Sequence, residues 1–504
     1  MSQSSQSQES AELHAAKYDP ESQSSQHGGQ DDNSLMRVVT EYTEYAVSHA
    51  DSHNIEENNR EVEEQENQEK QQDIEQMDKL GPIKTGFWSK RKTQERKSFL
   101  VQYAIIIVIL WAFILSAFSI YWGSMYGRQN RFVNLKVLVA IEQGADVNNS
   151  DYPLSQAILE TIQLPELETL LGWEPHNFTS DDEIVDKVYK QKYWAAIYVS
   201  SNDVSRQLVE AIENGSDLNT SSLVRCYYET GRDLNGQNQF VKPSLADFGV
   251  AFSQIVQQKV YPKLLSNLTP DQFAKLQNTS ILTNTPTVEY IDGKKVTNTV
   301  VLAPLQVGLI YIIIITFFQV TWFQKLNQNV ASHLKPKSYI GYRMVQSQVT
   351  FLLVSLGYSC LNAAFQIPMN KSWKGGFGVL WMFSYLAMAA VGGANENLSL
   401  ICFAVFPPMM GFWLLFFVVS NISATFAPIE VCPEFYRFTY AFPIKNAYEL
   451  MKMQLFDTYR GQLGRNIGVL IAWIVLNNIL FPFCLYFFSW SMKRNMMKAK
   501  AGKN

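Results

Sequence analysis

Apolar residues in this chain are gathered into long uninterrupted runs separated by more polar segments. The first run, residues 99–122, carries no charged residue and exceeds the roughly 20 residues needed to cross the hydrocarbon of a bilayer. Further charge-free runs occupy residues 304–323, 345–365, 375–392, 398–420 and 467–490. The pattern predicts an α-helical membrane protein with six spans, arranged as one span, a large insertion and five more spans.

Two details qualify the predicted spans. Pro407 and Pro408 lie inside the run 398–420, and because proline lacks a backbone N–H, this helix should be kinked or split. The run 99–122 begins about a hundred residues into the chain and lacks a small-residue cleavage site, which indicates an uncleaved signal anchor.

Basic residues set the expected orientation in the membrane. They precede the first run as Lys90, Arg91, Lys92, Arg96 and Lys97, and follow the last as Lys493, Arg494, Lys498, Lys500 and Lys503. The positive-inside rule places both clusters in the cytosol, which agrees with an even number of spans. Residues 491–504 then form a basic cytoplasmic tail, the loop 325–343 is also cytosolic, and residues 123–303 and 421–466 lie outside.

Glycosylation sequons agree with this topology. Within 123–303 they occur at Asn148, Asn177, Asn214, Asn219, Asn267 and Asn278, whereas the Asn-rich start of the chain has none. A match at Asn397 falls in the short cytosolic turn expected between two spans and is predicted to be coincidental. Asn370 and Asn421 lie too close to the predicted spans to be used.

The segment 123–303 is predicted to be one α/β domain. Strand patterns occur near 133–141 and 194–200, and helical patterns near 155–171, 202–212 and 245–265. In the second outside loop, residues 445–456 have the pattern of a helix with one apolar side. This helix either lies at the membrane interface or packs beneath the outside domain.

Residues 1–98 are predicted to form a disordered cytoplasmic tail, because they are rich in Gln, Ser and Glu and poor in aromatic residues. The stretch 56–79 favours at most a transient helix, with a coiled coil as the alternative. The acidic tail also contributes most of the formal net charge of −4, so no nucleic-acid surface is expected.

No sequence motif indicates catalysis. The chain has no P-loop, no G-x-S-x-G and no H-E-x-x-H pattern, and its five cysteines and six histidines have no metal-ligand spacing. We therefore expect no enzyme activity, no metal and no cofactor. The absence of Asp, Glu, Lys, Arg and His from the six runs also argues against a proton-coupled pump.

Neutral polar residues do occur inside the runs, at Gln346, Gln348, Asn362, Asn477 and Asn478. They can form hydrogen bonds between helices, or they can line a polar path or a groove for a lipid headgroup. The sequence alone leaves both interpretations open.

Three segments carry a resemblance to a known family: YYETGRD at 227–233, APLQVGLIYIIIITFFQ at 303–319, and the stretch from FYRFTYAFPIKNAYE to LGRNIGVLIAW at 435–473. With them the chain resembles the fungal nitrosoguanidine-resistance family of membrane proteins over roughly residues 85–495. That family is similar to the membrane half of type-2 ABC exporters and to bacterial phage-infection-protein-like membrane proteins.

The resemblance implies a plasma-membrane protein that contributes to drug or toxic-compound resistance, through export or through control of the membrane lipid environment. It also implies that the loop 325–343 contacts a separate ATPase, and that residues 435–456 form short helices near the outer surface. Membrane lipids and a second copy of the chain are further expected partners. The alternative is a membrane organiser or stress sensor that transports nothing.

Two of the five cysteines, Cys226 and Cys432, lie on the outside in this topology, whereas Cys360, Cys402 and Cys484 lie within the predicted spans. Since disulfides form in oxidising compartments, the sequence predicts a Cys226–Cys432 bond that ties the outside domain to the loop before the last span. The alternative is that each is a small buried apolar side chain.

Overall fold

The computed structural model describes residues 93–147, 149, 151–276 and 279–501. The predicted tail lies outside these residues up to residue 92, and so do the predicted glycosylation sites Asn148 and Asn278.

Five helices in the described part of the chain are long and apolar enough to cross a membrane. They are Thr93–Met125, made of α3 (Thr93–Phe113), η2 (Ile114–Phe118) and α4 (Ser119–Met125); Thr299–Trp322, which ends in α12 (Gly308–Trp322); α14 (Pro336–Ala364); α15 (Gly376–Val405); and α18 (Leu463–Ala501). A further apolar helix, α16 (Met409–Ile422), is shorter. The prediction of several membrane helices is confirmed, and the sixth span stays a prediction.

The boundary between α15 and α16 corrects the sequence analysis. Residues 393–397, where a turn was expected, lie inside α15, and the chain turns instead at Phe406, Pro407 and Pro408. Proline cannot donate the helical hydrogen bond and clashes with the preceding turn, so α15 ends at Val405. The two expected helices are therefore divided about a dozen residues later than their hydropathy indicated.

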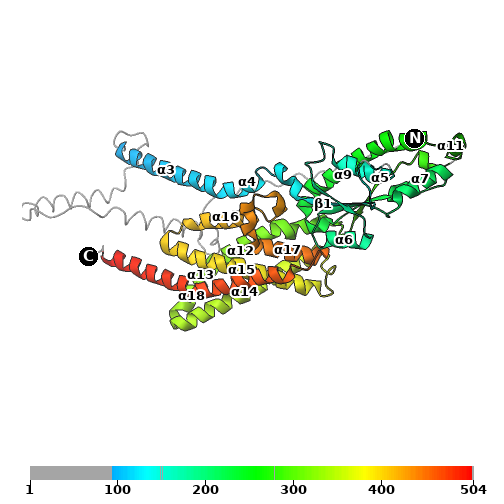
Figure 1. The fold of residues 1–504 in the computed structure, drawn as a ribbon. Coiled ribbons are helices and arrows are strands. Elements are labelled where there is room, and N and C mark those ends of the chain that lie inside the picture. Colours follow the sequence, from blue (N-terminus) through cyan, green and yellow to red (C-terminus); the bar gives the residue numbers. More distant parts are fainter. Residues whose placement is uncertain (1–92, 148, 150, 277–278, 502–504) are drawn as a thin grey trace, which may run out of the picture. The chain divides into compact units, whose positions relative to one another are not determined.

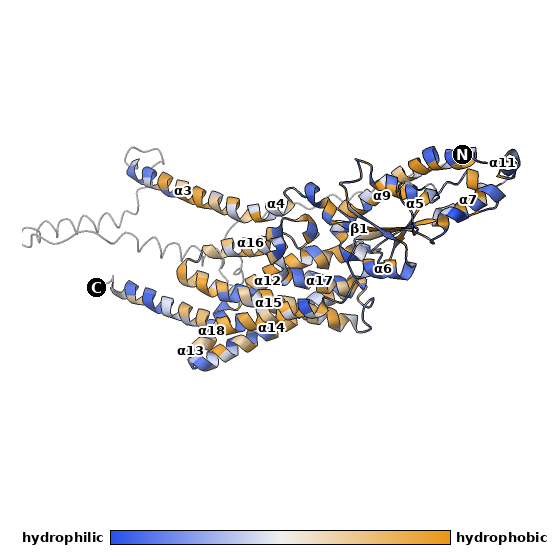
Figure 2. Ribbon diagram, viewed as in Figure 1, coloured by the Kyte–Doolittle hydropathy of each residue, from blue (hydrophilic) through white to orange (hydrophobic). Residues whose placement is uncertain are grey.

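The bundle is centred on α15. Slightly more than half of its most apolar stretch is buried, compared with 6% for the first long helix. The first helix contacts the bundle near its end, where the ring of Phe113 lies 4.6 Å from that of Phe412 and Tyr436 donates a hydrogen bond of 2.6 Å to the carbonyl of Ile120. Most of α3 is exposed and coloured as hydrophobic in Figure 2, as expected for a helix that faces lipid.

The insertion between the first two long helices is an α/β domain with a mixed sheet of order β2-β1-β3-β4-β5. The strands are β1 (Lys136–Ile141), β2 (Gly172–Asn177), β3 (Ala195–Val199), β4 (Val224–Tyr228) and β5 (Val288–Asp292). Neighbouring pairs are parallel except β3 and β4, which are antiparallel. Strands β1 and β3 lie where the sequence predicts strands, whereas β2 and β4 were not predicted.

Helices cover both faces of this sheet (Figure 1). The helices α5 (Pro153–Ile162), α7 (Val204–Asn214) and α9 (Lys242–Ile255) pack on one face and form the main core, while α6 (Asp181–Tyr189) packs on the other. The side of α9 that faces the sheet carries Phe248 and Phe252, whose rings stack 6.0 Å apart. The periodic apolar positions that predicted α5, α7 and α9 are the ones buried here, whereas α6 was not predicted.

Two shorter helices connect the parts of the membrane bundle. Helix α13 (Gln324–His333) lies between α12 and α14, and α17 (Pro443–Phe456) lies between α16 and α18. The side chain of Gln454 at the end of α17 donates a hydrogen bond of 3.0 Å to the carbonyl of Gly376, the first residue of α15. At the start of α17, the Ile444 N–H donates to Asn421 near the end of α16. The end of α16 and the start of α15 therefore lie on the same side of the bundle.

Candidate functional site

An ion pair lies buried between the membrane helices α14 and α15. The guanidinium of Arg343 donates to one carboxylate oxygen of Glu396, and both residues are 7% exposed. The hydroxyl of Ser347 donates to the other oxygen at 2.7 Å. Arg343 also donates a weak hydrogen bond of 3.4 Å to the hydroxyl of Tyr339. Charges are costly inside a membrane bundle, so a paired Arg and Glu there mark a candidate functional site.

This ion pair was not predicted from the sequence. Arg343 lies just before the run 345–365, and Glu396 lies in the expected turn at 393–397, so the apolar runs were free of charge while the helices are not. Both helices extend beyond their apolar runs because their polar residues find partners in each other. The expectation of charge-free membrane helices is therefore wrong for α14 and α15. The available signal was Glu396, a charged residue in the short gap between the apolar runs 375–392 and 398–420.

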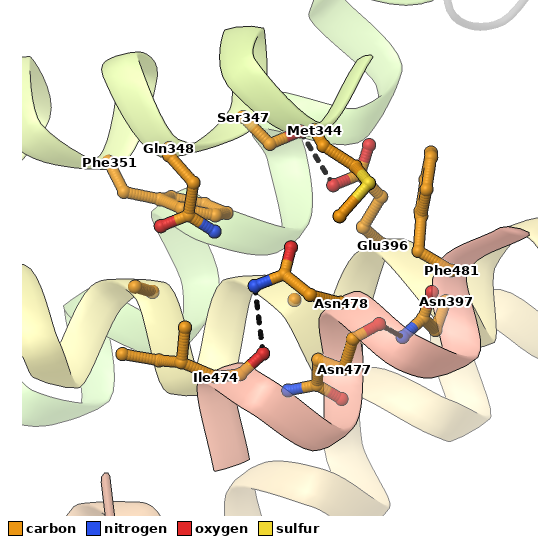
Figure 3. A pocket seen from close by; sticks show the side chains of 12 residues that line it. Met344, Ser347, Gln348, Phe351, Glu396, Asn397, Ile474, Asn477, Asn478 and Phe481 are labelled. Atoms are coloured by element: carbon orange, nitrogen blue, oxygen red, sulfur yellow. Dashed lines mark hydrogen bonds between the residues drawn. The ribbon is translucent and has the colours of Figure 1, made fainter. Parts of the chain in front are cut away.

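Two small cavities meet at this ion pair, and Glu396 and Ser347 border both. The first cavity lies between α14, α15 and α18 and is shown in Figure 3. Its polar lining consists of Ser347, Gln348, Glu396, Asn397, Asn477 and Asn478. The second lies between α12, α13, α14 and α15, and its polar lining includes Thr316, Gln319, Asn327, Arg343, Gln346 and Glu396.

Four of the five polar residues singled out from the sequence gather around these cavities. Gln346 borders the second cavity, and Gln348, Asn477 and Asn478 border the first. Asn362 lies elsewhere and donates a hydrogen bond of 2.8 Å to the carbonyl of Tyr358 within α14. The structure thus brings Gln346, Gln348, Asn477 and Asn478 to one region and leaves Asn362 apart.

Two asparagines also form hydrogen bonds between α18 and α15. Asn477 donates a hydrogen bond of 2.9 Å to the carbonyl of Ala390, and Asn397 donates one of 2.9 Å to the carbonyl of Asn477. The amide of Asn478, by contrast, bonds within its own helix, to the carbonyl of Ile474 (Figure 3). Interhelical bonding and cavity lining therefore occur together at Asn477.

Several buried polar atoms beside the cavities have no hydrogen-bond partner within the described residues. They are Nε of Arg343, Oε1 of Gln346, Oδ1 of Asn327 and Oδ1 of Asn397. A buried polar atom without a partner costs about 1–3 kcal/mol, and folded proteins contain few of them. Because these atoms belong to residues that line the two cavities, they could form hydrogen bonds with a polar group bound there.

Small residues in α15 allow the neighbouring helices to approach this site. A Cβ atom on Gly392 would lie 2.2 Å from the ring of Phe351, and one on Gly393 would lie 2.8 Å from the Cβ of Asn477. Phe351 is 1% exposed and borders both cavities. Its ring therefore packs against Gly392 beside both cavities.

A second charged cluster joins α17 to the α/β domain. Glu449 lies 2.8 Å from the ammonium of Lys452 and 3.3 Å from that of Lys445, and Lys452 also donates a hydrogen bond of 2.7 Å to the carbonyl of Arg232 in the α/β domain. Burial alone would raise the pKa of Glu449, but the two ammonium groups outweigh burial and lower the pKa to about 2.

This cluster decides between the two interpretations of residues 445–456. Thirteen of the fourteen residues of α17 are buried, so the helix packs beneath the α/β domain and does not lie at a lipid interface. The segment 227–233 meets α17 here, and the guanidinium of Arg232 stacks 3.9 Å above the ring of Trp194. Two of the segments that carry the family resemblance thus converge at one buried junction.

The structure does not form the predicted disulfide, because the thiols of Cys226 and Cys432 are both free. Cys226 lies opposite Ile197 in the sheet and points into the main core of the domain, away from the face to which Tyr227 contributes. Cys432 belongs to a different cluster, and its sulfur lies 3.6 Å from the carbonyl of Pro428. Burial raises the pKa of both thiols, which makes them less reactive.

The predicted glycosylation sites within the described residues lie on the surface of the α/β domain. Asn177, Asn214, Asn219 and Asn267 are all exposed. Asn397 is 3% exposed inside α15, which corrects its expected position in a turn, and Asn421 is fully buried. Among the described residues, no group of three or more His, Cys, Asp or Glu side chains could hold a metal ion.

Fold and site define a multi-pass membrane protein with an α/β domain between its first two long apolar helices. Residues 106–479 match a family described as "Protein of unknown function (DUF3533)", and the chain belongs to this family. The chain is 30% identical over 441 aligned residues to "Uncharacterized endoplasmic reticulum membrane protein YJR015W" of Saccharomyces cerevisiae. The aligned segment covers 83% of this chain and 86% of the yeast protein. No solved structure matches the chain.

Proposed function

We propose that this protein binds an amphipathic molecule between its membrane helices and moves it, and that it thereby exports toxic compounds or controls the lipid environment of the membrane. The observation that carries this proposal is the buried Arg343–Glu396 pair, which lies between two cavities with unpartnered polar atoms. The charge pair and the unpartnered polar atoms supply partners for a charged or strongly polar headgroup, for which the cavities, each about 10 Å³ in volume, would have to widen.

The lining of the cavity in Figure 3 is amphipathic. The amides of Gln348, Asn477 and Asn478 offer hydrogen bonds, while Met344 and Phe481 offer apolar contact. Only about a fifth of the most apolar stretch of α14 and of α18 is buried. A molecule whose tail stays in lipid could therefore approach this cavity between these two helices.

The resemblance to nitrosoguanidine-resistance proteins and type-2 ABC exporters supports a role in drug resistance and transport at the plasma membrane. In that arrangement both termini are cytosolic, the chain crosses the membrane six times, the α/β domain is a glycosylated outside domain, and α13 contacts a separate ATPase. Exposed Lys325 and Leu326 on α13 offer a surface for such a partner. The yeast relative bears the name of an endoplasmic reticulum membrane protein, so imaging of a tagged chain decides between these two membranes.

One observation favours the alternative function of a membrane organiser or stress sensor that transports nothing. The buried junction at α17 connects the α/β domain to the helix bundle through the hydrogen bond from Lys452 to the carbonyl of Arg232. A domain that senses the wall or the lipid state could transmit that state to the bundle through this junction. We propose no enzymatic reaction for either function.

The test is movement of a fluorescent phospholipid, and of a fluorescent drug, by the purified full-length protein in liposomes, with and without candidate ATPases. We expect wild-type protein to accelerate movement and Glu396→Gln to reduce it strongly. Glu434→Gln is the matched control, because Glu434 is an exposed glutamate in an exposed ion pair. Wild-type protein that moves neither probe would exclude transport of these probes and favour the sensor.

A further inference from the structure

We propose that Glu396 is a proton-binding site, and that its protonation releases Arg343 and supplies the coupling ion for movement of the amphiphile. The coupling rests on the proposed function, whereas the proton site does not. The proton is added to the carboxylate of Glu396, the charge pair is broken, and Arg343 keeps its own charge. The chain would then contain its own means of using a proton gradient.

The geometry around Glu396 can accommodate both protonation states. In the ionised state one carboxylate oxygen accepts from Arg343 and the other accepts from Ser347 at 2.7 Å. A hydroxyl both donates and accepts, so Ser347 can accept from the protonated carboxyl after a rotation of its own O–H. Protonation therefore removes one charge-assisted bond and leaves the Ser347 contact in place.

Further hydrogen-bond acceptors lie in the lining of the second cavity, which Arg343 also borders. The side-chain amide oxygens of Gln346 and Asn327, two residues of that lining, are buried and accept no hydrogen bond from the described residues. The Nε of Arg343 also lacks a partner there. These two oxygens can take over hydrogen bonds from the guanidinium when Glu396 becomes neutral. Hydrogen bonds to these two oxygens would lower the free-energy cost of burying the Arg343 cation without an ionised carboxylate beside it.

Few other groups compete for the proton. Among the described side chains that line the two cavities, Arg343 and Glu396 are the charged ones. On α14, Tyr339 adds a phenol that contacts Arg343. The linings from α12, α13 and α18 contribute neutral groups, and the polar ones among these are Thr316, Gln319, Asn327, Asn477 and Asn478. A proton that enters this site therefore has Glu396 as its acceptor.

The pair lies nearer to one end of α15 than to the other. Glu396 precedes the end of α15 at Val405 by about 14 Å and follows its start at Gly376 by about 30 Å, at a rise of 1.5 Å per residue. The distant end is the one that contacts α17 beneath the α/β domain. On that side Phe351 rests on Gly392. Protons would enter from the end of the bundle remote from the α/β domain.

The competing explanation is a purely structural ion pair that holds α14 to α15 and stays ionised. The two explanations differ in whether the carboxyl of Glu396 is ever protonated in the folded protein. A hydrophobic carbodiimide reports this directly, because it reacts with protonated carboxyl groups in apolar surroundings and leaves carboxylates unmodified.

The test treats the full-length protein in lipid nanodiscs with dicyclohexylcarbodiimide over a pH series and locates the adduct by peptide mass spectrometry. We expect modification of Glu396 that increases severalfold as the pH falls, and no adduct at that position in Glu396→Gln. Glu434→Gln should leave the labelling of Glu396 unchanged. Absence of the adduct from wild-type Glu396 at every pH would overturn the proposal.

A second measurement tests the coupling separately. Phospholipid movement in liposomes should respond to an imposed pH gradient in wild-type protein and lose this response in Glu396→Gln. Movement that ignores the gradient would refute coupling while the proposed function stands. If no movement occurs although Glu396 is labelled, the proposed function and the coupling fail and the proton site remains.

Discussion

Replacing Glu449 with Gln should destabilise the protein by about 3–5 kcal/mol, because it leaves two buried ammonium groups without their carboxylate. Lys445 and Lys452 are 5% and 3% exposed, and each lies within 3.3 Å of Glu449. The pKa of Glu449 gives a similar loss of folding free energy. Its lowering from 4.5 to about 2 corresponds to about 3 kcal/mol of stabilisation at neutral pH.

The direction of the pH dependence follows from the sign of this shift. The pKa is lower in the folded protein, so the stabilisation is present above pH 4.5 and is lost as the pH falls toward about 2. Glu449→Gln should therefore be less sensitive to acid over this window than wild type.

The assay is thermal unfolding of purified protein in detergent, followed by tryptophan fluorescence. Glu434→Gln is the control, because Glu434 and Arg437 form an ion pair in which both side chains are more than 70% exposed, and such a pair contributes about 0–1 kcal/mol. We expect a much larger fall in the unfolding midpoint for Glu449→Gln than for this control. Equal midpoints for both variants and wild type would refute the reasoning.

A further variant separates an unpaired charge from lost packing. Replacing the set with apolar residues, as Lys445→Met, Glu449→Leu and Lys452→Met together, should be less destabilising than Glu449→Gln alone. If the triple variant is as unstable as the single one, the hydrogen bonds from Lys452 to Arg232 and from Lys445 to Thr425 carry the stability instead.

Three further predictions concern other parts of the chain. Gly392→Leu should destabilise by about 1–3 kcal/mol because it overlaps the ring of Phe351, whereas Gly378→Leu on the same helix meets nothing within 4 Å and should unfold like wild type. Endoglycosidase should increase the protein's gel mobility, and substituting the exposed Asn177, Asn214 and Asn267 together should remove much of that shift. Alkylation of unreduced, denatured protein should recover Cys226 and Cys432 as free thiols, and a disulfide-linked peptide would contradict the structure.

The membrane helices could be predicted from the sequence, but their ends could not. Hydropathy locates apolar residues, whereas a helix continues as long as its backbone bonds and side chains have partners. Glu396 and Asn397 interrupt the apolar pattern, yet they remain helical because Arg343 and Asn477 bond to them. Pro407 and Pro408 were predicted to kink or split one helix. In the structure they form the turn between α15 and α16.

The candidate site could be predicted only in part. Gln346, Asn477 and Asn478 were singled out because polar residues inside apolar runs are conspicuous. The packing of α17 against the segment 227–233 is a contact between residues more than 200 positions apart, and no local pattern encodes it. The same limit applies to Cys226, because its orientation in β4 depends on a strand that was not predicted.

The most direct test of the account exchanges the two charges of the membrane site. Arg343→Glu combined with Glu396→Arg keeps an ion pair between α14 and α15, so the protein should fold and insert with a melting temperature close to that of wild type. We predict that this variant, in liposomes, moves fluorescent phospholipid no faster than protein-free liposomes do. Movement at the wild-type rate would contradict the account, because it would show that the pair only holds the helices together.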